Sequence, residues 1–150
     1  VRGWMDWADK ELAVLLFPNL TRSFSESYEA FSYVQEVPTF SLLDKYSNHV
    51  AGATAMWLAQ GKLKKKYKIE DERAALASSL SKWADALDNK LFLGGSSPNL
   101  ADLCVFGVLR AVDGSATQKV IEDSPVADWY KRMRELVGER GGARVAREAK

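Results

Sequence analysis

One histidine, one cysteine, a carboxylate before an apolar run and a cluster of lysines are the residues of this 150-residue chain that could carry chemistry. His49 is the only histidine, and a general base or a metal ligand needs a second polar group beside it. Asp44 lies five residues earlier, which is a poor spacing for two side chains on one helix face. We therefore expect a structural or surface role for His49.

Cys104 is the only cysteine, so an intrachain disulfide and a CxxC redox or zinc motif are excluded within these residues. It lies between Leu103 and Val105, without the exposure and the basic neighbours that a reactive thiolate needs. We expect it to be a small buried apolar side chain. A single cysteine fits a reducing, intracellular compartment. An organelle such as a chloroplast or mitochondrion is one candidate location.

Five lysines fall within the run KLKKKYK at residues 62–68: Lys62, Lys64, Lys65, Lys66 and Lys68. One interpretation is a contact surface for anionic lipid headgroups at the edge of a membrane. The other is a solvated helix end, where cations complement the helix dipole. The acidic residues at 70–72 would offset the lysines at the start of the next helix, so we prefer this second interpretation.

The segment PNLADLC at residues 98–104 has the pattern of a helix start. Asn99 suits the N-cap position, and Asp102, three residues on, can accept a hydrogen bond from the Asn99 N–H. This reciprocal pair is a capping box, and the helix dipole also favours the carboxylate. We therefore assign Asn99 and Asp102 a structural role, with no catalytic residue in the chain.

Helices are expected to position all of these residues, because apolar residues recur at spacings of three and four along most of the chain. We predict helices over about 4–17, 23–37, 40–66, 70–87, 100–113 and 126–137, with the four prolines between them (Pro18, Pro38, Pro98 and Pro125). The helix at 100–113 is apolar on almost every face and should be buried. The fold class is all-α, a bundle of six or more helices over residues 1–137, followed by a mobile polar tail over 138–150.

For several other side chains in these helices, we expect roles in packing or ion pairing. The small residues of AGATAM at 51–56 would let another helix approach closely. Arg110 should pair with a carboxylate or a helix C-terminus. Four aromatic residues at helical spacing are expected in the core rather than around a cofactor: Tyr28, Tyr33, Trp57 and Trp83.

Composition excludes several classes of function. The net charge of +1 gives no overall field for nucleic acid, and no apolar run is long enough for a transmembrane helix. The chain starts at Val1 without a signal peptide, so we expect a processed form or a piece of a longer protein.

The capping box that opens an apolar helix after an LGG loop resembles the C-terminal helical domain of the glutathione transferases. That family has Ser or Thr where this chain has Asn99, and Asp102 matches. More specifically, the chain resembles the membrane-associated prostaglandin E synthase type-two family and its plant relatives. The matching stretches are residues 7–23, 51–56, 62–73, 92–112 and 129–133.

The resemblance implies a two-part protein. A thioredoxin-like domain with Cys-Pro-x-Cys would bind the thiol, and the helical domain would form one wall of an apolar substrate pocket. No residue here matches the thioredoxin-like part, so we expect no cofactor in this chain, and glutathione only if such a domain precedes it. We expect this chain to be a non-catalytic binding or accessory module. A protein partner would then cover the face that the thioredoxin-like domain covers in the family. The alternative is that the chain is a fragment of a glutathione-dependent transferase or isomerase. Animal members carry a haem-linked histidine where this chain has Tyr67.

Overall fold

The computed structural model of the chain describes residues 1–36, 38–39 and 41–138. These residues form helices joined by short loops, and the only β pairing among them is an isolated bridge between Phe92 and Gly95. The all-α prediction is therefore confirmed. The predicted tail from residue 139 onward and the side chain of Tyr33 lie outside the described part of the chain.

A nearly continuous helical rod begins the fold. It comprises α1 (Arg2–Trp7), a π-helical segment η1 (Ala8–Leu12) and α2 (Ala13–Leu20). Next come α3 (Phe24–Ala30), the 3-10 segment η2 (Ser32–Glu36) and the long helix α4 (Leu42–Tyr67). The chain then forms α5 (Glu72–Leu87), α6 (Leu100–Leu109), the 3-10 segment η3 (Arg110–Val112), α7 (Gln118–Glu122) and α8 (Ala127–Val137).

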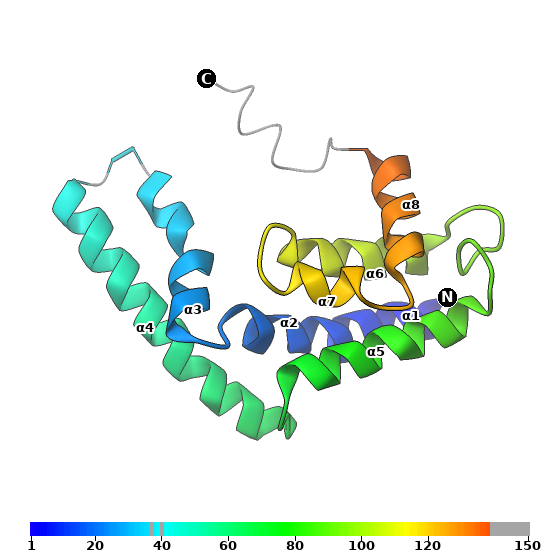
Figure 1. The fold of residues 1–150 in the computed structure, drawn as a ribbon, viewed down its shortest axis with the longest axis horizontal. Helices are drawn as coiled ribbons and strands as arrows, with labels where there is room; N and C mark the ends of the chain where they lie inside the picture. The colour runs from blue at the N-terminus through cyan, green and yellow to red at the C-terminus, as the bar shows by residue number, and fades with distance from the viewer. Residues whose placement is uncertain (37, 40, 139–150) are drawn as a thin grey trace.

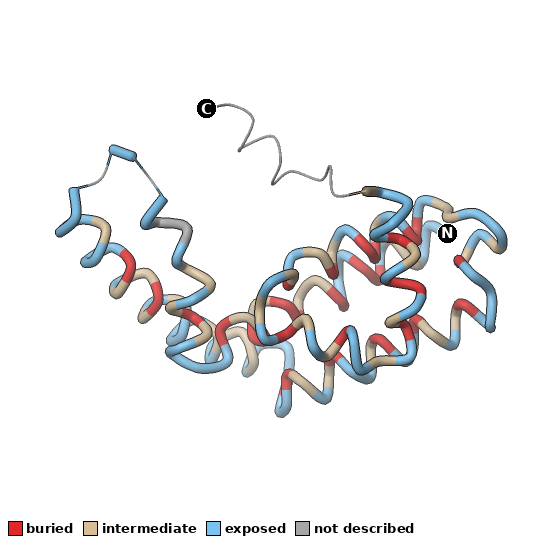
Figure 2. The backbone as a smooth tube through the Cα atoms, turned by 45° about the horizontal axis from the view of Figure 1, so that its top comes forward, coloured by how far each residue is buried: buried red, intermediate tan, exposed pale blue. Residues whose placement is uncertain are grey.

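The helices are arranged as a bundle with an arm. The rod, α5, α6 and α7 lie side by side, α8 packs against them, and α3 and α4 form a hairpin that projects from one end (Figure 1). Buried residues are concentrated in the bundle, whereas the arm is mostly exposed or half-buried (Figure 2). A chain of tryptophans runs through the core: Trp83 lies 5.3 Å from Trp4 and 5.4 Å from Trp129, measured between ring centroids.

The prediction that Pro18 ends the first helix is wrong, because Pro18 lies inside α2. Proline lacks the N–H that would bond four residues back, so the last turn loses one backbone hydrogen bond. Two side chains hold this turn instead. Asn19 donates to the carbonyl of Leu15 at 2.8 Å, and Thr21 donates to the carbonyl of Phe17 at 2.7 Å.

The small residues of α4 allow close packing, as the sequence predicts. A Cβ atom added to Gly52 would lie 2.1 Å from the ring of Phe31, so any larger residue here would force that ring to move. The inner face of α4 is buried at His49 and Ala53. The prediction for Trp57 is wrong: it is 41% exposed, because α4 lies outside the bundle core and much of its surface is uncovered. Trp83 is buried as expected.

Candidate functional site

The start of α6 contains the capping box that the sequence predicts. The Asn99 side-chain oxygen accepts hydrogen bonds from the N–H groups of Ala101 at 2.8 Å and Asp102 at 3.2 Å. In return, the Asp102 carboxylate accepts from the Asn99 N–H at 2.9 Å. These bonds satisfy N–H groups that have no partner within the helix.

Asp102 also ties two distant segments to α6, which the sequence pattern does not reveal. Its carboxylate accepts hydrogen bonds from the Leu93 N–H at 2.9 Å, the Gly94 N–H at 3.3 Å and the Trp129 indole N–H at 3.0 Å. Asp102 is completely buried. With the N–H of Asn99, four donors occupy its two oxygens, so this carboxylate holds the fold together and is not available to a substrate.

The lysine-rich end of α4 is anchored by one buried carboxylate. Glu72 accepts from Lys64 at 2.5 Å and pairs with Arg22 at 3.1 Å. Burial opposes the ionisation of Glu72, but the hydrogen bond from Lys64 and the charge of Arg22 outweigh it and lower its pKa. Among the described residues, Lys62, Lys65 and Lys68 have no ion-pair partner. The run is thus partly a helix end, with four lysines (Lys62, Lys65, Lys66 and Lys68) facing solvent.

Residues singled out in the arm serve its packing. His49 is buried, its ring stacks on Tyr28 at 3.8 Å, and both ring nitrogens have partners. The Gln35 amide donates to Nδ1 at 2.8 Å, and Nε2 bonds the Tyr28 carbonyl at 2.5 Å. Asp44 lies apart and bonds Ser41. In the part of the chain that the structure describes, no group of three or more His, Cys, Asp or Glu side chains could hold a metal ion.

The end of α6 carries a cluster of charged residues. Arg110 pairs with Asp113 at 3.6 Å, so Arg110 has the carboxylate partner that the sequence predicts. Asp113 also accepts from Tyr130 at 2.6 Å and pairs with Arg134 at 2.7 Å. Burial, followed by the hydrogen bond to Asp113, raises the pKa of Tyr130 above its usual value. Tyr130 therefore stays protonated and acts as a hydrogen-bond donor.

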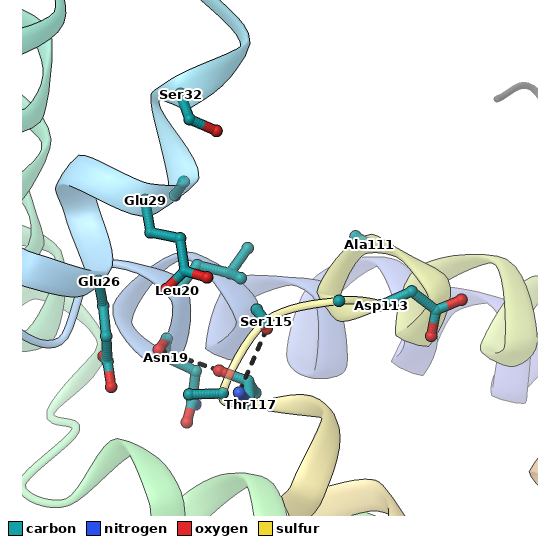
Figure 3. A pocket seen from close by; sticks show the side chains of 12 residues that line it. Asn19, Leu20, Glu26, Glu29, Ser32, Ala111, Asp113, Ser115 and Thr117 are labelled. Carbon is teal, nitrogen blue, oxygen red and sulfur yellow. Dashed lines mark hydrogen bonds between the residues drawn. The ribbon is translucent and has the colours of Figure 1, made fainter.

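A pocket of about 320 Å³ lies where the arm meets the bundle, and sequence patterns gave no sign of it. It is lined by the end of α2, by α3 and by the segment between α6 and α7. Figure 3 shows Glu26 and Glu29 on α3 and, across from them, Ser115 and Thr117. The Thr117 hydroxyl donates to the Asn19 carbonyl at 3.1 Å and fixes this segment to α2. The lining is rich in oxygen atoms and lacks histidine and cysteine.

The outer face of α6 is exposed, which corrects the prediction of a buried helix. Leu100 and Leu103 are 54% and 46% exposed, and Gly107 and Ala111 continue the same face at exposed positions. Their spacing of three and four residues places all four on one side of the helix axis. Cys104, predicted to be buried, is half-buried beside this face. The inner face is buried in the core through Ala101, Val105 and Leu109.

Comparison with known proteins identifies the family. Residues 56–132 match the family described as glutathione S-transferase, C-terminal domain. The chain belongs to this family. Its α6, with the capping box, lies within the matched region.

Two relatives are named prostaglandin E synthase 2. The chain is 38% identical to the Danio rerio protein over 133 residues, which are 87% of this chain and 35% of that protein. It is 34% identical to the Mus musculus protein over 139 residues, 91% of this chain and 36% of that protein. The chain thus spans about a third of the length of these relatives. None of the described helices is long and apolar enough to cross a membrane.

Proposed function

We propose that this chain is the helical domain of a two-part protein similar to prostaglandin E synthase 2, and that a thioredoxin-like domain packs on the outer face of α6. The observation that carries the proposal is the apolar stripe of Leu100, Leu103, Gly107 and Ala111, exposed on a helix whose opposite side is the bundle core. Exposed apolar stripes of this kind mark protein contact sites. The relatives supply a candidate for the covering element, because about two-thirds of their length lies outside the match.

The position of the pocket supports a role in binding substrate. Ala111, in the segment η3 that directly follows α6, is the last residue of the exposed stripe and also lines the pocket at the base of the arm. A domain that covers the stripe would therefore border the pocket, and the two domains would enclose a common site. In this arrangement, the helical domain supplies one wall of the site and selects the substrate by shape.

Catalysis in this proposal belongs to the covering domain. The candidate acids and bases of the described residues have structural partners: Asp102 is saturated by four donors, and His49 has both ring nitrogens occupied. Glutathione would bind on the thioredoxin-like domain. The reaction would be a glutathione-dependent transfer, or the isomerisation of prostaglandin H to prostaglandin E that the relatives' name suggests.

A second candidate is an accessory module without catalysis, which could serve in a membrane complex of an organelle. The same α6 stripe favours it, because a separate protein could cover Leu100 and Leu103 as readily as a domain of the same polypeptide. Light scattering after size-exclusion chromatography gives a first test of any contact at this face. A monomer that binds no dye for exposed apolar surface would count against both candidates.

Activity measurements separate the two candidates. We expect the chain alone to leave prostaglandin H unchanged beyond the background rate, and the chain joined to a thioredoxin-like segment from its own gene to form prostaglandin E with glutathione. In that two-part protein, the double substitution Leu100→Asp and Leu103→Asp should abolish the activity without unfolding the helical domain, because both side chains are already about half exposed. Activity that survives both substitutions would contradict packing at this face. An inactive two-part protein that still associates through α6 would favour the accessory module.

A further inference from the structure

Charge is segregated along the chain, and the positive part lies on α4 and its end. Six lysines and one aspartate, Asp44, give residues 42–69 a net charge of +5. The whole chain carries +1, which leaves −4 for all other residues. Between residues 45 and 69 there is no acidic residue at all. Residues 42–69 are thus a cationic segment of an otherwise slightly acidic chain.

The same helix exposes large apolar side chains. Leu43 is 77% exposed near its start, and Trp57 and Leu58 are 41% and 60% exposed near its middle. At 100° per residue, Leu43, Val50, Thr54, Leu58, Gly61 and Lys65 fall on one flank of α4, with Trp57 at its edge. We call this the α4 flank. It is distinct from the inner face, where His49 and Ala53 are buried in the arm.

The lysines beside the α4 flank are available to a partner. Glu72 holds Lys64, and the Lys66 ammonium lies 5.1 Å from the centre of the Tyr67 ring. Lys62, Lys65 and Lys68 are exposed and have no ion pair among the described residues. Glu70 and Asp71 are the acidic residues nearest to these lysines in the sequence. The Asp71 carboxylate, however, accepts hydrogen bonds from the N–H groups of Arg73 and Ala74 at the start of α5.

We propose that the α4 flank binds the surface of a membrane that contains anionic lipids. Trp57 and Leu58 would enter the headgroup layer, and Lys62, Lys65 and Lys68 would contact the lipid phosphates. Leucine and tryptophan beside lysines form the side-chain set of helices that lie in a membrane interface. An acidic protein or RNA would account for the lysines but not for the exposed Leu43 and Leu58. This contact is independent of the proposed function, because it uses the arm and not α6.

Vesicle sedimentation of the full chain tests the proposal. We expect binding to vesicles of phosphatidylcholine with about a third phosphatidylserine, and little binding to phosphatidylcholine alone. Each lysine near such a surface contributes roughly a fivefold gain in partitioning, so changing Lys62, Lys65 and Lys68 to Gln should lower it on the order of 100-fold. The matched control changes Lys10, Lys90 and Lys131 to Gln, which removes the same charge from the bundle and should have little effect.

Tryptophan quenching locates the contact. Lipids with bromine on the upper acyl chain should quench Trp57, and Trp57→Phe should remove most of this quenching. Of the other four tryptophans, Trp7, Trp83 and Trp129 are buried, and Trp4 is half-buried against the bundle core, away from the arm. Equal loss of binding in the two lysine variants, or unchanged quenching in Trp57→Phe, would overturn the proposal. So would binding that is equal on neutral and anionic vesicles, or binding to an acidic peptide or single-stranded RNA that exceeds vesicle binding and does not depend on Leu58.

Discussion

Trp129 on α8 donates its indole N–H to the carboxylate of Asp102 at the start of α6, over a distance of 3.0 Å. The two residues are 27 positions apart, and both are buried. The carboxylate thereby joins the cap of one helix to the side of another. Because the LGG loop also donates to Asp102 through Leu93 and Gly94, three segments depend on this single side chain.

Asp102→Ala should lower the free energy of unfolding by about 2–4 kcal/mol, which combines a lost cap with buried donors left without an acceptor. Asp102→Asn should cost less, because one side-chain oxygen can still accept. Urea denaturation followed by circular dichroism measures both values. A loss below about 1 kcal/mol for the alanine variant would show that the bonds of Asp102 can be replaced by water or by relaxation of the loop.

Comparing two tryptophan substitutions measures how much the Trp129–Asp102 hydrogen bond contributes to the free energy of unfolding. Trp129 and Trp83 are both fully buried and touch each other, but the Trp83 indole N–H has no hydrogen-bond partner. Trp129→Phe and Trp83→Phe therefore remove a similar volume, and only the first breaks a hydrogen bond. We expect Trp129→Phe to cost about 1–2 kcal/mol more, because the bond is to a charged acceptor. If thermal or urea unfolding shows the same loss of stability in Trp129→Phe and Trp83→Phe, the hydrogen bond adds nothing to stability.

Two glycines on α4 should respond to alanine in opposite directions. A Cβ atom on Gly52 would overlap the ring of Phe31, whereas a Cβ on Gly61 would meet no atom within 4 Å. Gly61→Ala should stabilise the arm by about 0.5–1 kcal/mol, the difference in helix propensity. Gly52→Ala should destabilise it by about 1–3 kcal/mol, because Phe31 must move. Hydrogen exchange of the α3 and α4 amides measures both changes, and faster exchange in Gly61→Ala would contradict the open surroundings.

Local patterns in the sequence predict the helices and the capping box, because these depend on residues a few positions apart. Asn99 and Asp102 are such a pair, and the small residues around Gly52 likewise indicate close packing. The partners of Asp102 from the LGG loop and α8 could not be predicted from spacing alone, since tertiary folding brings them together. The pocket at the base of the arm is missed for the same reason: it joins residues far apart in the sequence, such as Asn19 and Thr117, which are 98 positions apart.

Exposure is the other property that the sequence does not settle. An apolar helix face has the same pattern whether the core of its own chain or another domain covers it. The pattern therefore predicts that Leu100, Leu103 and Trp57 are buried, but all three are exposed in the structure. Pro18 fails as a helix stop, since α2 continues to Leu20 and the side chains of Asn19 and Thr21 bond carbonyl groups of its last turns.

Glu72 should make stability depend on pH. Its pKa is below the usual value of 4.5 in the folded chain, so its ion pairs stabilise the fold above that pH, and this contribution is lost as the pH falls through the lowered pKa. Glu72→Gln should cost about 1–2 kcal/mol at neutral pH, because the carboxylate is buried but its partners Lys64 and Arg22 are partly exposed.

The difference between Glu72→Gln and the unaltered chain should shrink as the pH falls through the lowered pKa of Glu72, because the protonated carboxyl group no longer carries a charge. Glu11→Gln is the matched control: Glu11 pairs with Lys82 at 3.2 Å, but both side chains are more than half exposed. We expect it to cost less than about 0.5 kcal/mol at any pH. Urea denaturation at about pH 7 and about pH 3.5 measures both variants. If Glu72→Gln lowers the free energy of unfolding by the same amount at both pH values, the side chain stabilises the fold by packing and not by its charge.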